Sequence, residues 1–383
     1  MGFWRETLPL LAMVGWNLRL DGYPVDALPT ASVSSCLFGR TVPRPMALNK
    51  AILAAFKAAT RLSPDVKSSY KAQRVAEDLS GALSLRNPRC RVEEMSATAP
   101  DGYEIPLLVF TPRDIDFSLR EGLQVSDESK GTILFFHGGG WVNGDTAFYA
   151  DACATTALQL ERRVVSVDYR RAPEHRFAQA PQDCYEVARQ RFAGTLLPDV
   201  NPHDIVLFGD SAGGNLAAVV SLMARDRGEF MPRRQMLLYP ATYNDHSSTS
   251  RFESVRTNGE DYLLTSQDVV DYMDLYISGP QDLQNPHFAP LLAPRLDDQP
   301  QTLVITAEYC PLRDEGETYA MRLEQEGNDV ACYRMFDAVH GYFLYPSVLS
   351  LVKDTYRIMR NFLDGEELEQ EAKPAWLKIS GIA

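Results

Sequence analysis

The sequence has little that would support a metal site, a disulfide framework or a nucleic-acid surface. Its six cysteines are spread over 383 residues without a C-x-x-C pair. That spacing favours neither zinc ligation nor a small disulfide-rich fold, and it predicts reduced thiols. The 51 acidic residues outnumber the 38 basic ones and leave a formal net charge of −13. Such a surface is poorly suited to neutralising phosphates, so we expect no nucleic-acid partner.

Long apolar runs are also missing. No stretch approaches the ~18 consecutive apolar residues that a membrane-spanning helix needs. The short apolar run from Leu8 to Val14 is interrupted by Pro9 and is soon followed by Asn17 and Arg19, which does not match a secretory signal. We therefore predict a cytoplasmic protein with no integral membrane span, with secretion or membrane association as the alternative. A homo-oligomer is an open alternative to a monomer.

What the sequence does have is a regular alternation of short apolar segments and helical segments from Gly131 onward. This alternation is typical of a mostly parallel sheet covered by helices, which is the α/β class. The expected strands are 132–136, 163–167, 205–208, 235–239, 302–306 and 331–336, and the expected helices are 145–160, 180–192, 212–227, 314–326 and 346–363. Two earlier segments, 91–98 and 103–110, flank a Pro-Asp-Gly turn and predict an antiparallel hairpin.

Three other segments depart from this alternation. Residues 44–88 carry apolar side chains at helical spacing before any strand pattern begins. Residues 114–130 are polar and charged, so we expect a surface loop there. Between 241 and 294 the alternation gives way to polar, proline-containing sequence with one helical run at 266–276, which predicts an insertion above the sheet.

A candidate nucleophile stands in the segment Gly209-Asp210-Ser211-Ala212-Gly213. It matches G-x-S-x-G, and it lies where that motif requires, between a predicted strand and a predicted helix. The small flanking residues allow a tight turn that holds the serine exposed at the end of the strand. Ser211 is therefore the predicted nucleophile.

A second motif, His137-Gly138-Gly139-Gly140-Trp141, follows the first strand of the alternating region. Serine attack on an ester leaves a negatively charged oxygen, and flexible backbone can direct N–H groups at it. We predict that the amides of Gly138, Gly139 and Ala212 form this oxyanion hole. His137 itself is expected to orient the loop rather than to transfer protons.

A serine hydroxyl needs a base at neutral pH. Of the six histidines, only His340 lies in a loop after the last predicted strand, which is where the order serine, acid, histidine would end. His340 is therefore the predicted general base. Apart from His137, the remaining four histidines lie in polar or proline-rich surroundings and are expected to be solvated or to have local structural roles. They are His175, His203, His246 and His287.

Taken together, these motifs resemble the hormone-sensitive-lipase-like family of α/β-hydrolases. The resemblance also rests on Asp168-Tyr-Arg-Arg-Ala-Pro-Glu174, on the continuation Gly-Asn215 of the serine motif and on Pro311-Leu-Arg-Asp-Glu315, and it covers about residues 90–364. It implies a serine carboxylesterase that acts on a small-molecule ester without a cofactor or metal. It also implies a helical cap formed partly by the N-terminal segment, and small to medium acyl chains as substrates.

One position departs from the family pattern. The family has a catalytic aspartate before Pro-Leu, whereas this chain has Cys310 there. A neutral thiol is a weak hydrogen-bond acceptor and does little to stabilise an imidazolium. A neighbouring carboxylate could supply the acid instead, with Asp314 as the first candidate and Glu308 and Asp337 after it. Asp314 could also simply cap the helix that begins there.

Two further interpretations of Cys310 remain open. Ser211 and His340 could work as a dyad at a reduced rate, or the fold could have become a ligand-binding or regulatory protein without useful turnover. A Cys310 thiolate paired with His340 is not favoured, because a histidine-paired thiol is normally itself the nucleophile.

The sequence thus predicts an α/β-hydrolase in three parts. An N-terminal helical segment, 1–88, contributes to the cap. A catalytic domain, 89–364, carries the cap insertion at about 241–294. A C-terminal tail, 365–383, completes the chain.

Overall fold

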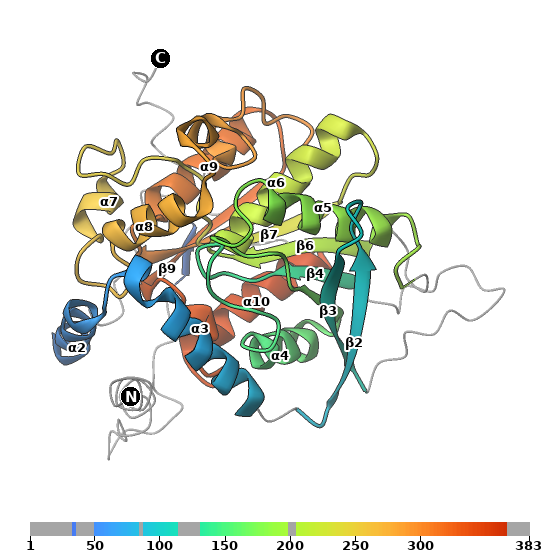
Figure 1. Cartoon of the computed structure of the whole chain (residues 1–383), viewed down its shortest axis with the longest axis horizontal. Helices are drawn as coiled ribbons and strands as arrows, with labels where there is room; N and C mark the ends of the chain where they lie inside the picture. Colours follow the sequence, from blue (N-terminus) through green and yellow to red (C-terminus); the bar gives the residue numbers. More distant parts are fainter. Residues whose placement is uncertain (1–32, 36–49, 84–86, 114–130, 198–203, 366–383) are drawn as a thin grey trace.

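The computed structural model describes residues 33–35, 50–83, 87–113, 131–197 and 204–365, which form one sheet with helices on both faces (Figure 1). The predicted loop 114–130 and the tail beyond 365 lie outside the described residues, as does most of the segment before residue 50. Within the described ranges, no helix is both long and apolar enough to cross a membrane.

The sheet has nine strands in the described part of the chain, in the order β1-β9-β8-β7-β6-β4-β5-β3-β2. Strands β4 to β9 run parallel to one another. Strand β1 at one edge and strands β3 and β2 at the other pair antiparallel to their neighbours. The strands are β1 (Val33–Ser35), β2 (Cys90–Thr98), β3 (Glu104–Pro112), β4 (Thr132–Phe136), β5 (Arg163–Val167), β6 (Ile205–Asp210), β7 (Arg234–Leu238), β8 (Gln301–Tyr309) and β9 (Val330–Val339). This confirms the predicted mostly parallel sheet and the hairpin, and adds the unpredicted strand β1.

The α-helices follow the predicted alternation. They are α2 (Lys50–Leu62), α3 (Val66–Leu83), α4 (Ala150–Leu160), α5 (Gln179–Phe192), α6 (Ala212–Arg227), α7 (Glu253–Thr257), α8 (Ser266–Tyr276), α9 (Arg313–Gln325) and α10 (Ser350–Asp364). Helix α4 begins five residues later than predicted, because the Asp145 side chain accepts a hydrogen bond from the Phe148 amide and fixes a turn there.

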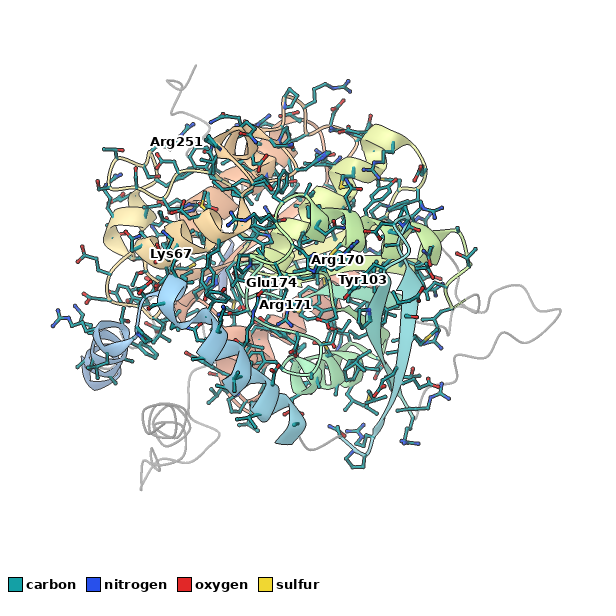
Figure 2. The ribbon with its side chains drawn as sticks, viewed as in Figure 1. Lys67, Tyr103, Arg170, Arg171, Glu174 and Arg251 are labelled. Atoms are coloured by element: carbon teal, nitrogen blue, oxygen red, sulfur yellow. The ribbon has the colours of Figure 1, made fainter. Side chains whose placement is uncertain are left out.

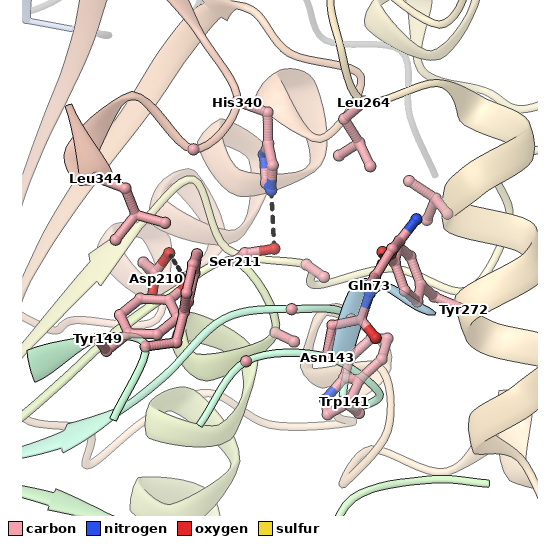
Figure 3. Close-up of a pocket in the computed structure, with 18 of the residues that line it drawn as sticks. Gln73, Trp141, Asn143, Tyr149, Asp210, Ser211, Leu264, Tyr272, His340 and Leu344 are labelled. Atoms are coloured by element: carbon pink, nitrogen blue, oxygen red, sulfur yellow. Dashed lines mark hydrogen bonds between the residues drawn. The ribbon is translucent and has the colours of Figure 1, made fainter. Parts of the chain in front are cut away.

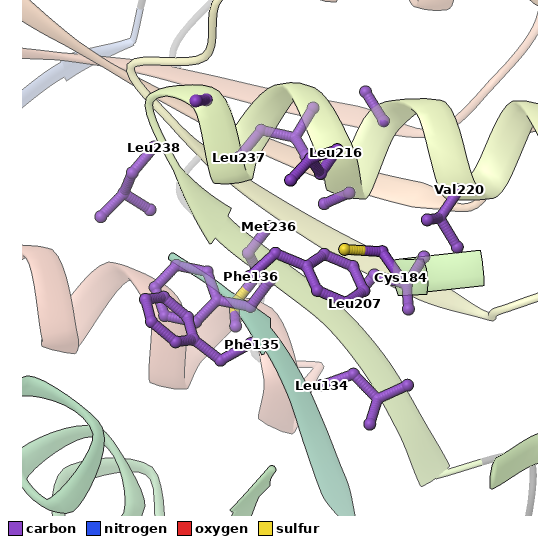
Figure 4. Packing of buried hydrophobic residues seen from close by; sticks show 14 of the residues in the cluster. Leu134, Phe135, Phe136, Cys184, Leu207, Leu216, Val220, Met236, Leu237 and Leu238 are labelled. Carbon is purple, nitrogen blue, oxygen red and sulfur yellow. The ribbon is translucent and has the colours of Figure 1, made fainter. Parts of the chain in front are cut away.

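The central strands are buried on both faces because helices cover the sheet from both sides. Helices α5, α6 and α9 lie on one side, and α4 and α10 lie on the other (Figure 1). Every residue of β4 and β5 is buried, which explains why these strands are nearly continuous apolar runs rather than alternating ones. Phe136 and Leu207 pack with Leu216 of α6 in the core between sheet and helix (Figure 4).

Helices α2 and α3 lie between β1 and β2 in the sequence and pack against the segment around α8. Lys67 at the start of α3 (Figure 2) pairs with Asp271 at 3.0 Å and with Asp274 at 2.7 Å, both on α8. The amide of Leu263 donates to the Thr60 hydroxyl of α2 at 2.9 Å. The N-terminal helices and the 241–294 insertion therefore form one assembly, and its action as a cap stays a prediction.

Candidate active site

Ser211 lies on the turn between β6 and α6 with a backbone φ of 56° and ψ of −121°. Such a positive φ is uncommon for a residue with a side chain and is typical of a strained strand-to-helix turn. The flanking glycines make the turn possible, because a Cβ on Gly209 would lie 2.2 Å from the Gly213 carbonyl oxygen. A Cβ on Gly213 would lie 1.9 Å from the Phe136 carbonyl oxygen.

His340 reaches Ser211 from the end of β9, which β8 and β7 separate from β6 in the sheet. It directly follows β9, and its Nε2 lies 2.8 Å from the Ser211 Oγ (Figure 3). The Tyr239 ring packs beside the imidazole with ring centroids 4.7 Å apart. The structure thus brings together the two residues that the sequence analysis selected as nucleophile and base.

Cys310 occupies the place of the acid on the other side of His340. The parallel strands β8 and β9 place Tyr309 opposite Val339, so the residues that follow them lie side by side. The Cys310 Sγ is 3.1 Å from the His340 Nδ1 and also accepts from the Leu312 amide at 3.4 Å. Because the thiol is fully buried, burial raises its pKa well above the ordinary value. Cys310 is therefore a neutral thiol at neutral pH.

The pKa of His340 reflects the same lack of a nearby charge. Burial lowers it to about 3, and no carboxylate offsets this effect. A carboxylate in hydrogen-bond contact would instead favour the protonated imidazole and raise the pKa. The neutral base form of His340 therefore persists at moderately acidic pH.

The carboxylates predicted as substitutes for the acid have other partners. One Asp314 oxygen accepts from the Ser254 amide at 2.7 Å, and the other accepts from the Arg313 Nε at 2.8 Å. Glu308 accepts from the Asp337 amide at 2.8 Å. The prediction of Asp314 as the first candidate for the substitute acid is therefore corrected, because the His340 Nδ1 contacts Cys310 instead. Asp314 lies in the first turn of α9 and ties that turn to α7 through the Ser254 amide. Its role is therefore at the helix end, although it is not the N-cap residue.

The glycine-rich loop after β4, Gly138–Trp141, was predicted to form the oxyanion hole, and we call it the oxyanion loop. It differs from the prediction at one residue. The Gly138 amide donates to the Asp210 carboxylate at 2.9 Å and so points away from the serine. Gly139 and Gly140 line the catalytic cavity instead, and neither amide has a partner among the described residues. Ala212 is the first residue of α6, where an N–H has no partner within the helix. The available donors are thus Gly139, Gly140 and Ala212, with Gly140 replacing Gly138.

The loop is held by buried polar contacts behind it. His137 stacks on the Tyr169 ring, 4.3 Å between centroids, and the Tyr169 hydroxyl donates to the His137 carbonyl oxygen. Burial lowers the pKa of His137 to about 4, so it is neutral at neutral pH. Asp210 is buried too, and burial raises its pKa to about 7. Asp210, the aspartate of the serine motif, thus accepts the hydrogen bond that fixes the Gly138 amide. The motif alone does not indicate this role.

Comparisons with known proteins identify the family of this chain. The family described as alpha/beta hydrolase fold matches residues 133–344. The chain belongs to the α/β-hydrolase family. An arylesterase of Saccharolobus solfataricus is 35% identical over 286 residues, which cover 73% of this hydrolase and 87% of the relative.

Other relatives have related names. The carboxylesterase NlhH of Mycobacterium tuberculosis is 32% identical over 268 residues, covering 68% of this hydrolase and 78% of the relative. The solved structure of a hyperthermophilic esterase from the archaeon Pyrobaculum calidifontis superimposes with a TM-score of 0.70 at 33% identity, covering 84% of this hydrolase and 99% of that chain. These matches confirm the resemblance to the hormone-sensitive-lipase-like carboxylesterases.

The catalytic cavity of this hydrolase has a volume of about 290 Å³. Ser211 and His340 line it between a side formed by Leu344 and Tyr149 and a side formed by Gln73, Asn143 and Tyr272 (Figure 3). Two residues of α3, Gln73 and Glu77, also line the cavity. They were not predicted from the sequence, because a helical pattern does not show which polar side chains face a cavity.

An aromatic stack joins the oxyanion loop to the insertion. The Trp141 ring stacks on the Tyr276 ring of α8 with centroids 4.6 Å apart, and Phe288 packs on both rings at 5.8 Å. All three side chains are buried. The oxyanion loop is therefore packed directly against the segment that is predicted to form the cap.

Proposed function

We propose that this hydrolase cleaves carboxylic esters through an acyl-enzyme on Ser211, with His340 as the general base. The chain is a serine ester hydrolase of the carboxylesterase class, since its family and its relatives named arylesterase and carboxylesterase agree on that activity. They do not favour the alternative of a binding protein without turnover. The observation that carries the residue assignment is the 2.8 Å contact between Ser211 Oγ and His340 Nε2 inside a cavity.

The reaction begins with attack of the Ser211 oxygen on the ester carbonyl carbon while its proton passes to His340 Nε2. The carbonyl oxygen becomes an oxyanion, which the amides of Gly139, Gly140 and Ala212 stabilise by hydrogen bonds. The intermediate collapses when the bond to the alcohol oxygen breaks and His340 returns the proton to that oxygen. Water then attacks the acyl-enzyme by the same proton transfers and releases the acid.

Cys310 makes this apparatus a weakened one. For Nε2 to accept the serine proton, the neutral imidazole must carry its proton on Nδ1 and donate it to the Cys310 sulfur. In that tautomer the sulfur accepts the Nδ1 proton but supplies no negative charge for the imidazolium that forms. This supports the interpretation of a Ser211–His340 dyad oriented by a thiol, with a turnover below that of a complete triad.

Small to medium acyl chains are the proposed substrates. The cavity volume of about 290 Å³ is at the lower limit of typical small-molecule sites, which span roughly 300–1,000 Å³. We also expect this site to cleave esters more readily than amides. An amine leaving group needs protonation by the His340 imidazolium, and the carboxylate that would stabilise that imidazolium is replaced by Cys310.

The test is turnover of p-nitrophenyl esters from acetate to octanoate, together with labelling by a fluorophosphonate. We expect turnover that is highest for the shorter chains and covalent labelling of the wild type, with both abolished in Ser211→Ala. A wild-type protein that is folded yet neither labels nor hydrolyses any of these esters would refute the proposed function.

A further inference from the structure

One end of the catalytic cavity is lined by polar side chains, and we call it the polar end. It consists of Gln73 and Glu77 of α3, Asn143 of the loop after β4, and Tyr272 of α8. In Figure 3, Gln73, Asn143 and Tyr272 gather on the side of Ser211 opposite Leu344. A Cβ on Gly140 would meet the Tyr272 ring at 2.3 Å, so the polar end directly adjoins the oxyanion loop.

Hydrogen bonds within the polar end join its amide and phenol side chains. The Asn143 Nδ2 donates to the Gln73 Oε1 and, at 3.2 Å, to the Tyr272 hydroxyl. The Asn143 side chain is buried, and its Oδ1 has no partner among the described residues. This oxygen is buried away from the open cavity, so it is not itself a contact for a ligand. The role of Asn143 in the polar end is to hold the Gln73 and Tyr272 side chains in place.

Glu77 adds a carboxyl group to the same wall. One of its oxygens accepts from the Gly144 amide at 2.9 Å, and no hydrogen bond from a described residue reaches the other. Burial, with a smaller contribution from Asp145, raises the pKa of Glu77 to about 7, against the opposing effect of Arg171 and Arg74. The carboxyl group is thus only partly solvated and is able to ionise when a donor approaches.

The two nearby arginines are occupied elsewhere and do not turn the polar end into an anion site. The Arg74 Nε donates to the Val142 carbonyl oxygen at 2.8 Å, and a further nitrogen pairs with Glu174 at 3.0 Å. Arg171 donates to the Gly144 carbonyl oxygen. The acidic group that the polar end offers a ligand is therefore the Glu77 carboxyl oxygen that no described residue contacts, and a hydrogen-bond donor is its complement.

We propose that the polar end binds a hydrogen-bond-donating group of the substrate, a hydroxyl or an ammonium, and that Glu77 is the residue that determines this specificity. The proposal rests on the proposed function and narrows its substrate class to esters that carry such a group on the alcohol or acyl side. One hydrogen bond to a charged group changes affinity by about tenfold or more, so the preference is measurable as a ratio of rates.

The experiment compares matched esters that differ in one group. On the alcohol side these are the butyrates of propanol, of ethylene glycol and of N,N-dimethylethanolamine, which carry a methyl, a hydroxyl and an ammonium with one N–H. On the acyl side they are methyl 3-methylbutanoate and methyl 3-hydroxybutanoate. We expect kcat/KM of the wild type to be about tenfold higher for a donor-bearing ester than for its apolar partner in at least one series.

Variants at Glu77 test which residue sets this ratio. Glu77→Leu should reduce the ratio to near one, whereas Asp78→Asn, which changes an exposed carboxylate on the same helix, should leave it unchanged. Glu77→Gln keeps an acceptor but loses the charge, so it should abolish a preference for the ammonium and retain part of a preference for the hydroxyl. A wild-type ratio of one or less in both series, or a ratio that Glu77→Leu does not alter, would overturn the proposal.

Binding to Ser211→Ala separates this proposal from the proposed function. Dissociation constants for the same esters, measured by calorimetry in that background, need no turnover. Tighter binding of the donor-bearing ester that Glu77→Leu removes would support the polar end even if no ester were hydrolysed. Equal affinities in the presence and absence of the Glu77 carboxyl group would refute it while leaving ester hydrolysis intact.

Discussion

Restoring a carboxylate at Cys310 should accelerate this hydrolase. Cys310→Asp places an acceptor where Sγ now lies 3.1 Å from His340 Nδ1 and 3.4 Å from the Leu312 amide. The new carboxylate would accept from both N–H groups and stabilise the imidazolium that forms during attack. Impairing the acid in serine proteases lowers turnover by about 10⁴, and this sets the upper limit of the gain.

The increase in turnover should be smaller than this limit, because the site is buried. Cys310 is fully buried, and burying a carboxylate is unfavourable even when it is paired. We therefore expect an increase in kcat of about 10²-fold, midway to the limit set by the serine-protease example. The assay is steady-state hydrolysis of p-nitrophenyl butyrate, with thermal melting to establish that the variant is folded.

Cys310→Asn is the matched control, since it has nearly the same shape as aspartate but no charge. We expect no acceleration from it. A folded Cys310→Asp protein whose kcat equals that of the wild type, or an equal gain in Cys310→Asn, would show that the missing charge does not limit the rate.

Three further predictions follow from the site. Because the pKa of His340 is lowered to about 3, the base stays neutral on acidification, so kcat/KM for p-nitrophenyl acetate should lose nothing to histidine protonation between pH 8 and pH 5. In Cys310→Asp the pKa should rise and the acid limb should move to higher pH; an acid limb near the ordinary pKa of about 6.5 in the wild type would contradict this. Asp314→Ala should lower the free energy of unfolding by about 1 kcal/mol through its lost hydrogen bonds while kcat changes little, and a folded variant without activity would restore Asp314 as the acid. Gly213→Ala should destabilise the protein by about 3 kcal/mol or more, because its Cβ would meet the Phe136 carbonyl oxygen at 1.9 Å, and a normal melting temperature would count against that geometry.

Much of the fold was predictable because the central strands and helices carry strong local patterns. Strands β4 and β5 and helices α6 and α8 begin and end as predicted. In these elements the apolar residues of the sequence pattern are the buried ones, and residues typical of turns and helix ends flank them. Strand β1 was not predicted, because its three residues gain their strand conformation by pairing with β9, far away in the sequence.

The site was predictable where a motif fixes the backbone and less so where contacts between distant segments decide. Ser211 and His340 follow from strand ends that tertiary structure must bring together. The choice between Gly138 and Gly140 depends on the hydrogen bond from Gly138 to Asp210, and the place of Asp314 depends on Ser254. Neither contact has a signature in the local sequence.

The aromatic stack of Trp141, Tyr276 and Phe288 has a consequence for how substrates enter. Since Trp141 directly follows the glycines of the oxyanion loop, a displacement of α8 large enough to widen the entrance would pull on the same backbone that stabilises the reaction intermediate. Opening of the cavity to an ester would thereby disturb the alignment of the oxyanion-loop amides. Bulky substrates that hold α8 outward should be penalised in kcat as well as in KM.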